Sequence, residues 1–331
     1  MWKFHITMVN NKTIFLTGGT GSFGMYFTKK TLKNKKIKKL IIFSRDEMKQ
    51  WVMKNEIKDK RLKFIIGDIR DSGRVEEITK NVDIIVHAAA TKIVPTAEEF
   101  PSECIKTNVL GAINLIAAAK KNGVKQVIAL STDKACNPVN LYGATKLTSD
   151  KLFVSSNDFK KNSTKFSVVR YGNVINSRGS VIPFFKSFPE GSTIPITHND
   201  MTRFMITLND AVNLVYKSLN EMIGGEIFVR KAASINILDI AKSIHKNLKT
   251  KIIGIRPGEK IHEEMISIND ARNTYEYKDI FKILPDLVDK RIKKKMIKNG
   301  KKVDKNFNYI SNKNSRWISP NELKKVLENS H

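Results

Sequence analysis

Short apolar runs recur through the first half of the chain and predict buried β-strands. They are rich in Ile and Val, show little alternation of polar and apolar positions, and cover residues 13–17, 39–43, 62–66, 83–87 and 126–130. Strands that are apolar on both faces are typical of a parallel sheet covered by helices on either side. The pattern therefore predicts an α/β domain.

The segments between these runs are long enough for the helices that connect parallel strands. The clearest one spans residues 112–121, where alanines and a leucine are followed by lysines and then by Gly123, a typical helix terminator. Alternating strands and helices predict a Rossmann-type doubly wound parallel sheet. We expect this domain to occupy residues 8–170, with the sheet completed by parts of 195–235.

Beyond Arg170, the spacing becomes irregular and glycine and proline are frequent. Such punctuation is typical of a loop-rich region. We expect residues 171–331 to form a smaller C-terminal domain that binds the substrate and ends in a tail. Helical patterns return within it at residues 209–222 and 237–248.

Composition excludes several classes of protein. With 41% hydrophobic residues, the 331-residue chain can bury a core without disulfides. Cys104 and Cys136 do not form a C-x-x-C pair, which argues against a disulfide framework and a cysteine zinc site, so we expect no metal. No apolar run approaches a membrane span, and the N-terminus lacks a signal-peptide core. We expect a cytoplasmic protein without membrane association, with Met8 as an alternative start and the first seven residues as an extension.

The net charge of +27, from 59 basic and 32 acidic residues, raises the question of nucleic-acid binding. The densest basic run, residues 290–303, has eight lysines and arginines but no interleaved aromatic residue. Stacking aromatics and a known nucleic-acid motif are both missing. A solvated lysine-rich surface is the favoured interpretation, with at most a nonspecific, salt-sensitive affinity for DNA.

The first predicted strand leads directly into a glycine-rich loop. Glycines in the pattern G-x-G-x-x-G let a dinucleotide pyrophosphate approach backbone N–H groups, and the following helix directs its positive end at the phosphates. A strand before and a helix after the loop are the required context. The predicted cofactor-binding residues here are Gly18, Gly19, Thr20, Gly21, Ser22, Phe23 and Gly24.

The end of the second strand bears on which dinucleotide is bound. Ser44 and Arg45 stand where NAD enzymes usually carry an acidic residue for the ribose. A guanidinium at this place can pair with a 2′-phosphate, which favours NADP. The alternative is a surface arginine, with Asp46 on the ribose of NAD. Asp68 either contacts the adenine or caps the next helix. The residues predicted at this end of the cofactor are Ser44, Arg45, Asp46, Lys49, Asp68 and Ile69.

A Y-x-x-x-K motif supplies candidate catalytic groups. Tyr142 and Lys146 lie four residues apart and therefore share one helix face. A lysine near a phenol favours the phenolate and makes the tyrosine a usable base. An ordinary amphipathic helix is the alternative, although the preceding Thr132, Asp133 and Lys134 directly follow a predicted strand.

These motifs resemble the extended short-chain dehydrogenases/reductases that modify nucleotide sugars, and most of all the inverting UDP-N-acetylglucosamine 4,6-dehydratases. The stretch STDKACNPVN at residues 131–140 is the most specific part. The similar stretches span nearly the whole chain and comprise residues 17–24, 44–47, 87–90, 131–147, 170–174, 177–183, 201–204 and 254–265.

The resemblance implies a reaction without net oxidation. Tyr142 would take the O4 proton while hydride leaves C4 for NADP, with Thr132 on the same oxygen and Lys146 on the nicotinamide ribose. Lys134 would move the C5 proton and Asp133 would protonate the departing C6 hydroxyl. Hydride return to C6 and reprotonation of C5 from the opposite face would give UDP-2-acetamido-2,6-dideoxy-β-L-arabino-hexos-4-ulose.

Lys134 distinguishes this chain from retaining sugar dehydratases, which resemble it but carry an acidic residue at this place. A lysine can act as a base only if its pKa is lowered, by burial or by nearby positive charge. We therefore expect a lowered pKa for Lys134. The alternative is a solvated loop lysine.

The resemblance also implies further contacts and a homo-oligomer. Ala88, Ala89, Ala90, Lys92, Val174, Tyr142 and Lys146 would contact the cofactor. Lys92, Thr132, Asn173, Val181, Arg203, Arg256 and Glu259 would bind UDP-N-acetylglucosamine.

The chain departs from the pattern in four places, at Thr91, Ile93, Asn176 and a shortened segment 184–195. These departures bear on the exact sugar more than on the reaction.

Two other functions compete with this prediction. A nucleotide-sugar epimerase on the same scaffold would share Thr132, Tyr142 and Lys146 but would not need Asp133 and Lys134. A redox-sensing binding protein would usually lack the Tyr or the Lys. The sequence leaves open whether a dehydratase product would serve pseudaminic acid or N-acetylated 6-deoxy-L-hexoses.

Overall fold

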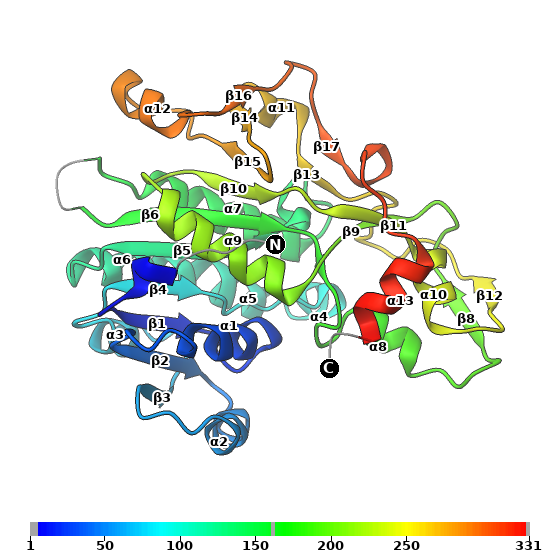
Figure 1. Cartoon of the computed structure of the whole chain (residues 1–331), viewed down its shortest axis with the longest axis horizontal. Helices are drawn as coiled ribbons and strands as arrows, with labels where there is room; N and C mark the ends of the chain where they lie inside the picture. Colours follow the sequence, from blue (N-terminus) through cyan, green and yellow to red (C-terminus); the bar gives the residue numbers. More distant parts are fainter. Residues whose placement is uncertain (1–5, 160–162, 329–331) are drawn as a thin grey trace.

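A ten-stranded sheet runs through the centre of the computed structural model, which describes residues 6–159 and 163–328 (Figure 1). The strand order is β16-β14-β15-β10-β6-β5-β4-β1-β2-β3. Residues 1–5 lie outside the described range, and with them most of the segment 1–7 for which we considered an N-terminal extension. The structure adds nothing on that expectation.

The first six strands form the predicted doubly wound parallel sheet. They are β1 (Thr13–Thr17), β2 (Lys39–Ser44), β3 (Leu62–Ile66), β4 (Ile84–His87), β5 (Gln126–Thr132) and β6 (Lys165–Tyr171). All pair in parallel, and every residue of β1 is buried. Because the strand order reverses between β1 and β4, the ends of these two strands open a crevice for a ligand. The predicted fold class is confirmed.

Helices cover both faces of this sheet. On one face, α1 (Ser22–Leu32) packs against α9 (Leu208–Glu221), and α2 (Glu47–Glu56) packs against β2 and β3. On the other, α6 (Gly111–Lys121) packs between α3 (Ser72–Ile78) and α7 (Leu141–Ser155). The helices expected at 112–121 and 209–222 are confirmed to within one residue at each end.

The sheet also draws strands from the C-terminal half of the chain. β10 (Ile227–Arg230) joins β6 in parallel, and β15 (Ile280–Ile283), β14 (Thr274–Glu276) and β16 (Lys301–Lys302) continue antiparallel. The central sheet therefore contains residues up to Lys302.

A smaller body lies beside the sheet, at the right of Figure 1. It contains β7 (Asn173–Val174), β9 (Thr202–Ile206) and β11 (Ala233–Asn236), a pair formed by β8 (Thr193–Ile196) and β12 (Lys249–Ile252), and the helices α8 (Val181–Lys186), α10 (Ile237–Ile244) and α13 (Pro320–Glu328). Its own apolar core includes Ile182, Phe185, Ile240 and Leu323.

The helix predicted over 237–248 is too long by one turn. It ends at Ile244 because His245 leaves the helix, its Nε2 lying 2.9 Å from the carbonyl oxygen of Phe185, and the chain then enters β12. The pairing of β12 with β8 therefore outweighs the helical pattern of residues 245–248.

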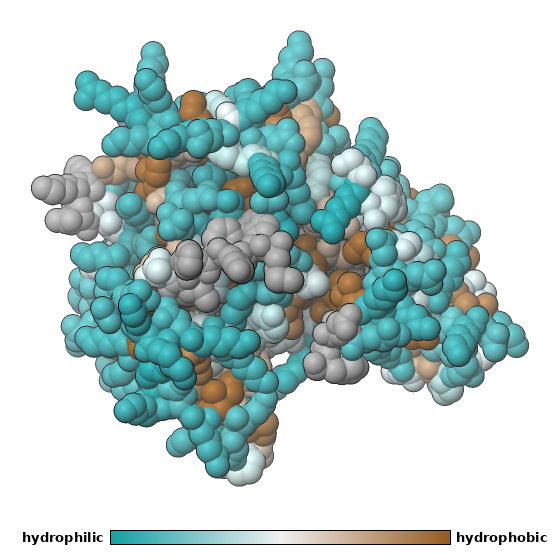
Figure 2. Space-filling view, viewed as in Figure 1, coloured by the Kyte–Doolittle hydropathy of each residue, from teal (hydrophilic) through white to brown (hydrophobic). Residues whose placement is uncertain are grey.

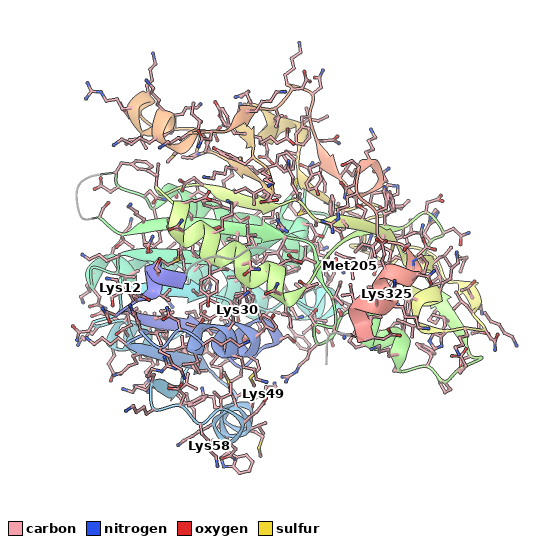
Figure 3. The ribbon with its side chains drawn as sticks, in the orientation of Figure 1. Lys12, Lys30, Lys49, Lys58, Met205 and Lys325 are labelled. Carbon is pink, nitrogen blue, oxygen red and sulfur yellow. The ribbon has the colours of Figure 1, made fainter. Side chains whose placement is uncertain are left out.

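The surface is polar and lysine-rich. One face is predominantly hydrophilic in Figure 2, and Figure 3 shows Lys12, Lys49 and Lys325 in separate parts of the molecule rather than along one stripe. Within the described ranges, the structure contains no helix that is both long and apolar enough to span a bilayer.

Candidate active site

A cleft of about 700 Å³ lies at the carboxyl ends of the parallel strands and extends under the loop after β7. It brings together residues from across the chain, and most of the predicted site residues line it. These are Gly18, Thr20, Gly21, Ser22, Phe23, Gly24, Ser44, Arg45, Lys49, Asp68, Ile69, Ala88, Ala89, Ala90, Lys92, Thr132, Asp133, Lys134, Tyr142, Lys146, Asn173, Val174 and Val181. The lining does not include the predicted residues Gly19, Asp46, Arg203, Arg256 and Glu259.

The glycine loop is closely packed where it turns into α1. Gly18 has φ +64°, and a Cβ there would lie 2.7 Å from the carbonyl oxygen of Ala88. A Cβ at Gly24 would lie 2.3 Å from the carbonyl oxygen of Gly19. A side chain at Gly18 would clash with the backbone that follows β4, and one at Gly24 would push α1 away from the loop. Glycine at both positions therefore lets the loop present the N–H groups at the start of α1 to the cleft.

At the end of β2, the carboxylate of Asp46 is already engaged. It caps α2 by accepting a hydrogen bond from the Lys49 backbone N–H at 2.8 Å, and it pairs with the Lys49 ammonium at 2.6 Å. Arg45 is exposed at the mouth of the cleft, with its guanidinium 3.9 Å from Asp68. Asp68 also pairs with Arg70 at 2.5 Å. Of the cations described at this end of the cleft, Arg45 therefore has the longest ion-pair distance, compared with Lys49 and Arg70.

The catalytic candidates converge where β5 ends. Thr132 is the last residue of β5, a 3₁₀ turn carries Asp133 and Lys134, and α7 carries Tyr142 and Lys146. The Asn140 side chain caps α7 by accepting from the Gly143 N–H at 2.7 Å. Gly143 is required because a Cβ would lie 2.3 Å from the carbonyl oxygen of Lys134. This contact brings the helix that carries Tyr142 against the turn that carries Lys134.

Burial dominates the electrostatics of the Tyr–Lys pair. It raises the pKa of Tyr142 to about 12, and Lys134 is the largest influence in the opposite direction. Burial also lowers the pKa of Lys146, an effect that nearby Asp150 opposes. Among the described cations, Lys134 thus lowers the pKa of Tyr142 most, whereas Lys146 is not one of its main influences.

The expectation of a lowered pKa for Lys134 is wrong for this structure. Burial alone would lower it, but the Lys134 ammonium lies 3.1 Å from Asp133 and 2.9 Å from Glu263, and these carboxylates raise its pKa above the ordinary value. Burial raises the pKa of Asp133. Motif reasoning missed Glu263, although it lies in the similar stretch 254–265.

A second buried group, also missed from the sequence, fixes the strands and helix around the site. Asp150 on α7 accepts hydrogen bonds from the Ser131 hydroxyl at 2.7 Å and from the Arg170 guanidinium at 3.2 Å. Arg170 also donates to the carbonyl oxygen of Met265 at 2.9 Å. The group joins β5, β6 and α7 to the segment that carries Glu263. Of the Asp150–Arg170 pair, only Arg170 could have been noticed from the sequence, because it lies in the stretch 170–174 that is similar to the family.

The substrate candidates lie in different surroundings. Lys92 reaches across the cleft and donates to the carbonyl oxygen of Arg178 at 2.8 Å. Asn173 lines the cleft and has a buried amide oxygen without a described partner. Glu259, 4.0 Å from Arg256, likewise has one buried oxygen without a described partner. Arg203 is buried, and its guanidinium donates to the carbonyl oxygens of Thr202 and Ile261.

One departure from the resembled pattern has a simple backbone explanation. Asn176 has φ +58°, in the left-handed region. Asparagine tolerates this region better than most residues, so it suits this position of the backbone.

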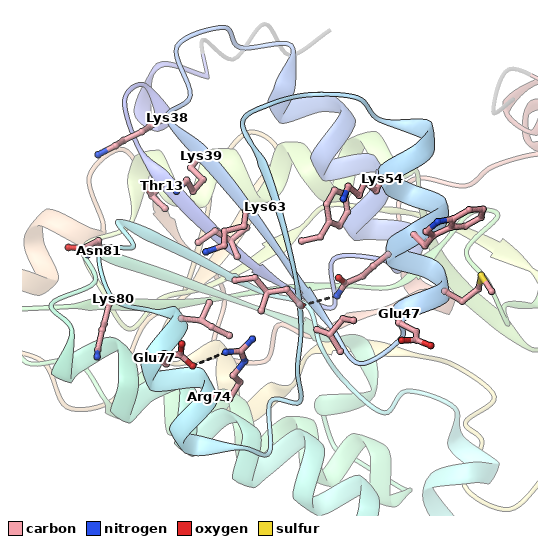
Figure 4. A pocket seen from close by; sticks show the side chains of 18 residues that line it. Thr13, Lys38, Lys39, Glu47, Lys54, Lys63, Arg74, Glu77, Lys80 and Asn81 are labelled. Atoms are coloured by element: carbon pink, nitrogen blue, oxygen red, sulfur yellow. Dashed lines mark hydrogen bonds and ion pairs between the residues drawn. The ribbon is translucent and has the colours of Figure 1, made fainter.

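A larger groove of about 1,050 Å³ lies elsewhere, beside the edge strand β3 (Figure 4). Lys38, Lys54, Lys63 and Lys80 are among its lining residues, and an ion pair joins Arg74 to Glu77 at 2.7 Å. Of the described residues that line this groove, none is a predicted catalytic, cofactor or substrate residue. We therefore place the active site in the smaller cleft.

Comparison with known proteins agrees with the motifs. Residues 14–285 match the polysaccharide biosynthesis protein family. The chain is 50% identical, over 98% of its length and 99% of the other protein, to an inverting UDP-N-acetylglucosamine 4,6-dehydratase of Campylobacter jejuni subsp. jejuni. A UDP-glucose 4-epimerase of Rickettsia canadensis is 41% identical over 97% of this chain and 96% of its own. The crystal structure of Pen from Bacillus thuringiensis superposes with a TM-score of 0.88 at 36% identity, covering 97% of this chain and 98% of that one. The resemblance inferred from the motifs is confirmed.

Proposed function

The chain belongs to the polysaccharide biosynthesis protein family, and from this premise we propose that it is a UDP-N-acetylglucosamine 4,6-dehydratase that inverts C5. The observation that carries the proposal is the buried Asp133–Lys134 pair, which faces the cleft beside Tyr142. The dehydratase relative is also more similar than the epimerase relative, at 50% against 41% identity.

The cleft fits a nicotinamide dinucleotide, and we propose that the cofactor is NADP. Glycines at the loop leave room for a pyrophosphate against the backbone N–H groups, and Ala88, Ala89 and Ala90 line the cleft beside this loop. Arg45 is exposed to receive a 2′-phosphate, whereas the Asp46 carboxylate is occupied by Lys49. Held by these residues, a nicotinamide would supply an acceptor and then a donor of the hydride that moves from the sugar C4 to C6.

In the first step, Tyr142 takes the proton of the C4 hydroxyl and Thr132 hydrogen-bonds the same oxygen. The raised pKa of Tyr142 makes its phenolate a strong base. Lys134 stabilises that phenolate, because its ammonium is the largest influence that lowers the pKa of Tyr142. Lys146 binds the nicotinamide ribose.

In the second step, Lys134 and Asp133 remove water across C5 and C6. Because the pKa of Lys134 is raised rather than lowered, its proton must pass to a partner before the nitrogen can act as a base. Asp133 Oδ1 lies 3.1 Å from the ammonium, so one proton shift from nitrogen to oxygen gives both a neutral amine and a carboxylic acid. The amine then takes the C5 proton, and the acid protonates the C6 hydroxyl, which leaves as water. Reprotonation of C5 from the face opposite Lys134 completes the inversion.

NMR of the products in deuterated water tests this proposal. With UDP-N-acetylglucosamine, a 4-keto, 6-deoxy product that carries deuterium at C5 in the L-configuration is expected. Lys134→Ala should abolish it while the cofactor stays bound, and Lys58→Ala, at an exposed position, should not. A simple 4-epimer as product would support the epimerase instead.

The proposal extends to the assembly and to the product. We propose a homo-oligomer that supplies a 4-keto sugar nucleotide for surface or glycoprotein sugars. Size-exclusion chromatography with light scattering should give a mass at least twice that of the 37.6 kDa chain. The mass of a monomer would contradict the proposed homo-oligomer.

A further inference from the structure

Glu263 is a buried carboxylate to which the proposed reaction assigns no step. Its backbone is fixed on both sides, because its N–H donates to the Ser311 hydroxyl at 3.0 Å and its carbonyl oxygen accepts from the Ser311 N–H at 2.8 Å. Its side chain is only 2% exposed. The backbone contacts therefore hold the carboxylate inside the protein, on the side of the cleft where Lys134 lies.

One oxygen of Glu263 faces two cations. Glu263 Oε1 lies 2.9 Å from the Lys134 ammonium and 3.8 Å from Arg203 Nε. Lys134 lies at the same time 3.1 Å from Asp133, so two carboxylates share one ammonium. Arg203 cannot turn away to the cleft without losing its bonds to the carbonyl oxygens of Thr202 and Ile261, so its charge stays beside Glu263.

The ionisable groups around Lys134 come from four directions. Asp133 is its neighbour in the turn, Tyr142 faces it from α7, Arg203 from β9, and Glu263 from the segment before β13 (Glu264–Ile266). Lys260 acts on Glu263 from the preceding loop. Of the two carboxylates in this set, Asp133 lines the cleft and Glu263 does not. Glu263 can therefore influence the reaction only through its neighbours.

We propose that Glu263 is a positioning residue, which holds the Lys134 ammonium beside Asp133 and makes Lys134 a stronger base toward the C5 proton. The role in catalysis rests on the proposed dehydratase function, whereas the effect on the charge of Lys134 does not. An anion at hydrogen-bond distance stabilises the protonated lysine. A base with a higher pKa removes a proton from carbon faster once it is neutral, but it stays protonated up to a higher pH.

Chemical labelling tests the charge of Lys134 without any substrate. Neutral amines react with acetic anhydride and ammonium groups do not. The acetylation rate of Lys134, measured relative to that of exposed Lys58, therefore reports the neutral fraction of Lys134. Both rates are read by peptide mass spectrometry between pH 7 and 9. Lys134 is 24% exposed through the cleft, which admits the reagent. Glu263→Gln should accelerate this labelling by about tenfold for each unit by which the pKa falls.

Two further variants calibrate the labelling. Glu263→Asp moves the carboxylate away from Lys134, so its labelling rate should lie between those of wild type and Glu263→Gln. This variant keeps the test valid even if Glu263→Gln fails to fold. Glu264→Gln is the matched control, because the Glu264 carboxylate accepts from Asn137 at 2.6 Å rather than contacting Lys134. Unchanged labelling of Lys134 in the Glu263 variants would overturn the proposal, as would equal acceleration in Glu264→Gln.

Turnover then tests the link to catalysis. In Glu263→Gln, the acidic limb of the kcat profile should move to lower pH and the plateau rate should fall, with little change in KM. A purely structural role would lower the rate at every pH without moving the limb, and that result would refute the catalytic part. If the wild type forms no dehydrated product, the dehydratase proposal fails, while the labelling result still decides whether Glu263 controls the charge of Lys134.

Discussion

Replacing Asp150 by asparagine should destabilise the protein strongly, because it leaves a buried guanidinium without its nearest counterion. The Asp150 and Arg170 side chains are 2% and 3% exposed and lie 3.2 Å apart. After the change, Arg170 would keep the carbonyl oxygen of Met265 at 2.9 Å, and the closest other carboxylate is Asp270 at 3.9 Å. Breaking such a pair by removing one partner typically costs about 3–5 kcal/mol.

The assay is urea denaturation followed by circular dichroism at pH 7. Glu56→Gln is a suitable control, since it breaks an exposed pair with Lys29 and should cost less than about 1 kcal/mol. The double variant Asp150→Asn with Arg170→Met should recover part of the loss, because neither charge is then buried. If Asp150→Asn costs no more than Glu56→Gln, the argument from uncompensated burial is refuted.

Three further changes have defined outcomes. Arg45→Ala should lower the ratio of NADP to NAD affinity by about tenfold or more in fluorescence titrations, since charge-assisted contacts are worth roughly 1.5–3 kcal/mol; an unchanged ratio would contradict a 2′-phosphate contact. Gly24→Ala should abolish cofactor binding in the same titration because its Cβ would lie 2.3 Å from the Gly19 carbonyl oxygen, whereas Gly73→Ala, whose nearest neighbour would be 3.6 Å away, should bind normally. Burial and Lys146 lower the pKa of His87 from 6.5 to about 3, so the unfolded state binds a proton below pH 6.5 that the native state refuses. As the pH is lowered from 5.5 to 4, the free energy of unfolding should therefore fall more steeply in wild type than in His87→Asn, by about 1.4 kcal/mol for each pH unit. Parallel curves in urea denaturation would exclude a contribution of His87 to the pH dependence of stability.

Much of the site could be predicted because its residues are set by short-range requirements. Gly24 is dictated by contact with the nearby Gly19 backbone, and the spacing of Tyr142 and Lys146 places them on one face of α7. Both are read from a few adjacent positions. The roles predicted for these residues in binding and catalysis stay predictions.

The extension of the sheet could not be foreseen in the same way. β14 and β16 are only three and two residues long, and both depend on antiparallel pairing for their existence. Such short strands carry no reliable periodicity. Similarly, residues 245–248 continue a helical pattern, but the pairing of β12 with β8 ends the helix earlier.

The sequence by itself determined the Rossmann-type order of strands and helices, the glycine loop and the chemical groups available for catalysis, because each depends on residues that are close along the chain. Only the tertiary structure decided the charge of Lys134. Its sequence neighbourhood suggested a lowered pKa, yet folding places Glu263 at 2.9 Å from the ammonium, and this carboxylate together with Asp133 outweighs the effect of burial. Electrostatic interaction falls off with distance through space and not along the chain, so Glu263, far away in sequence, adds to the effect of the adjacent Asp133 in raising the pKa of a candidate catalytic lysine.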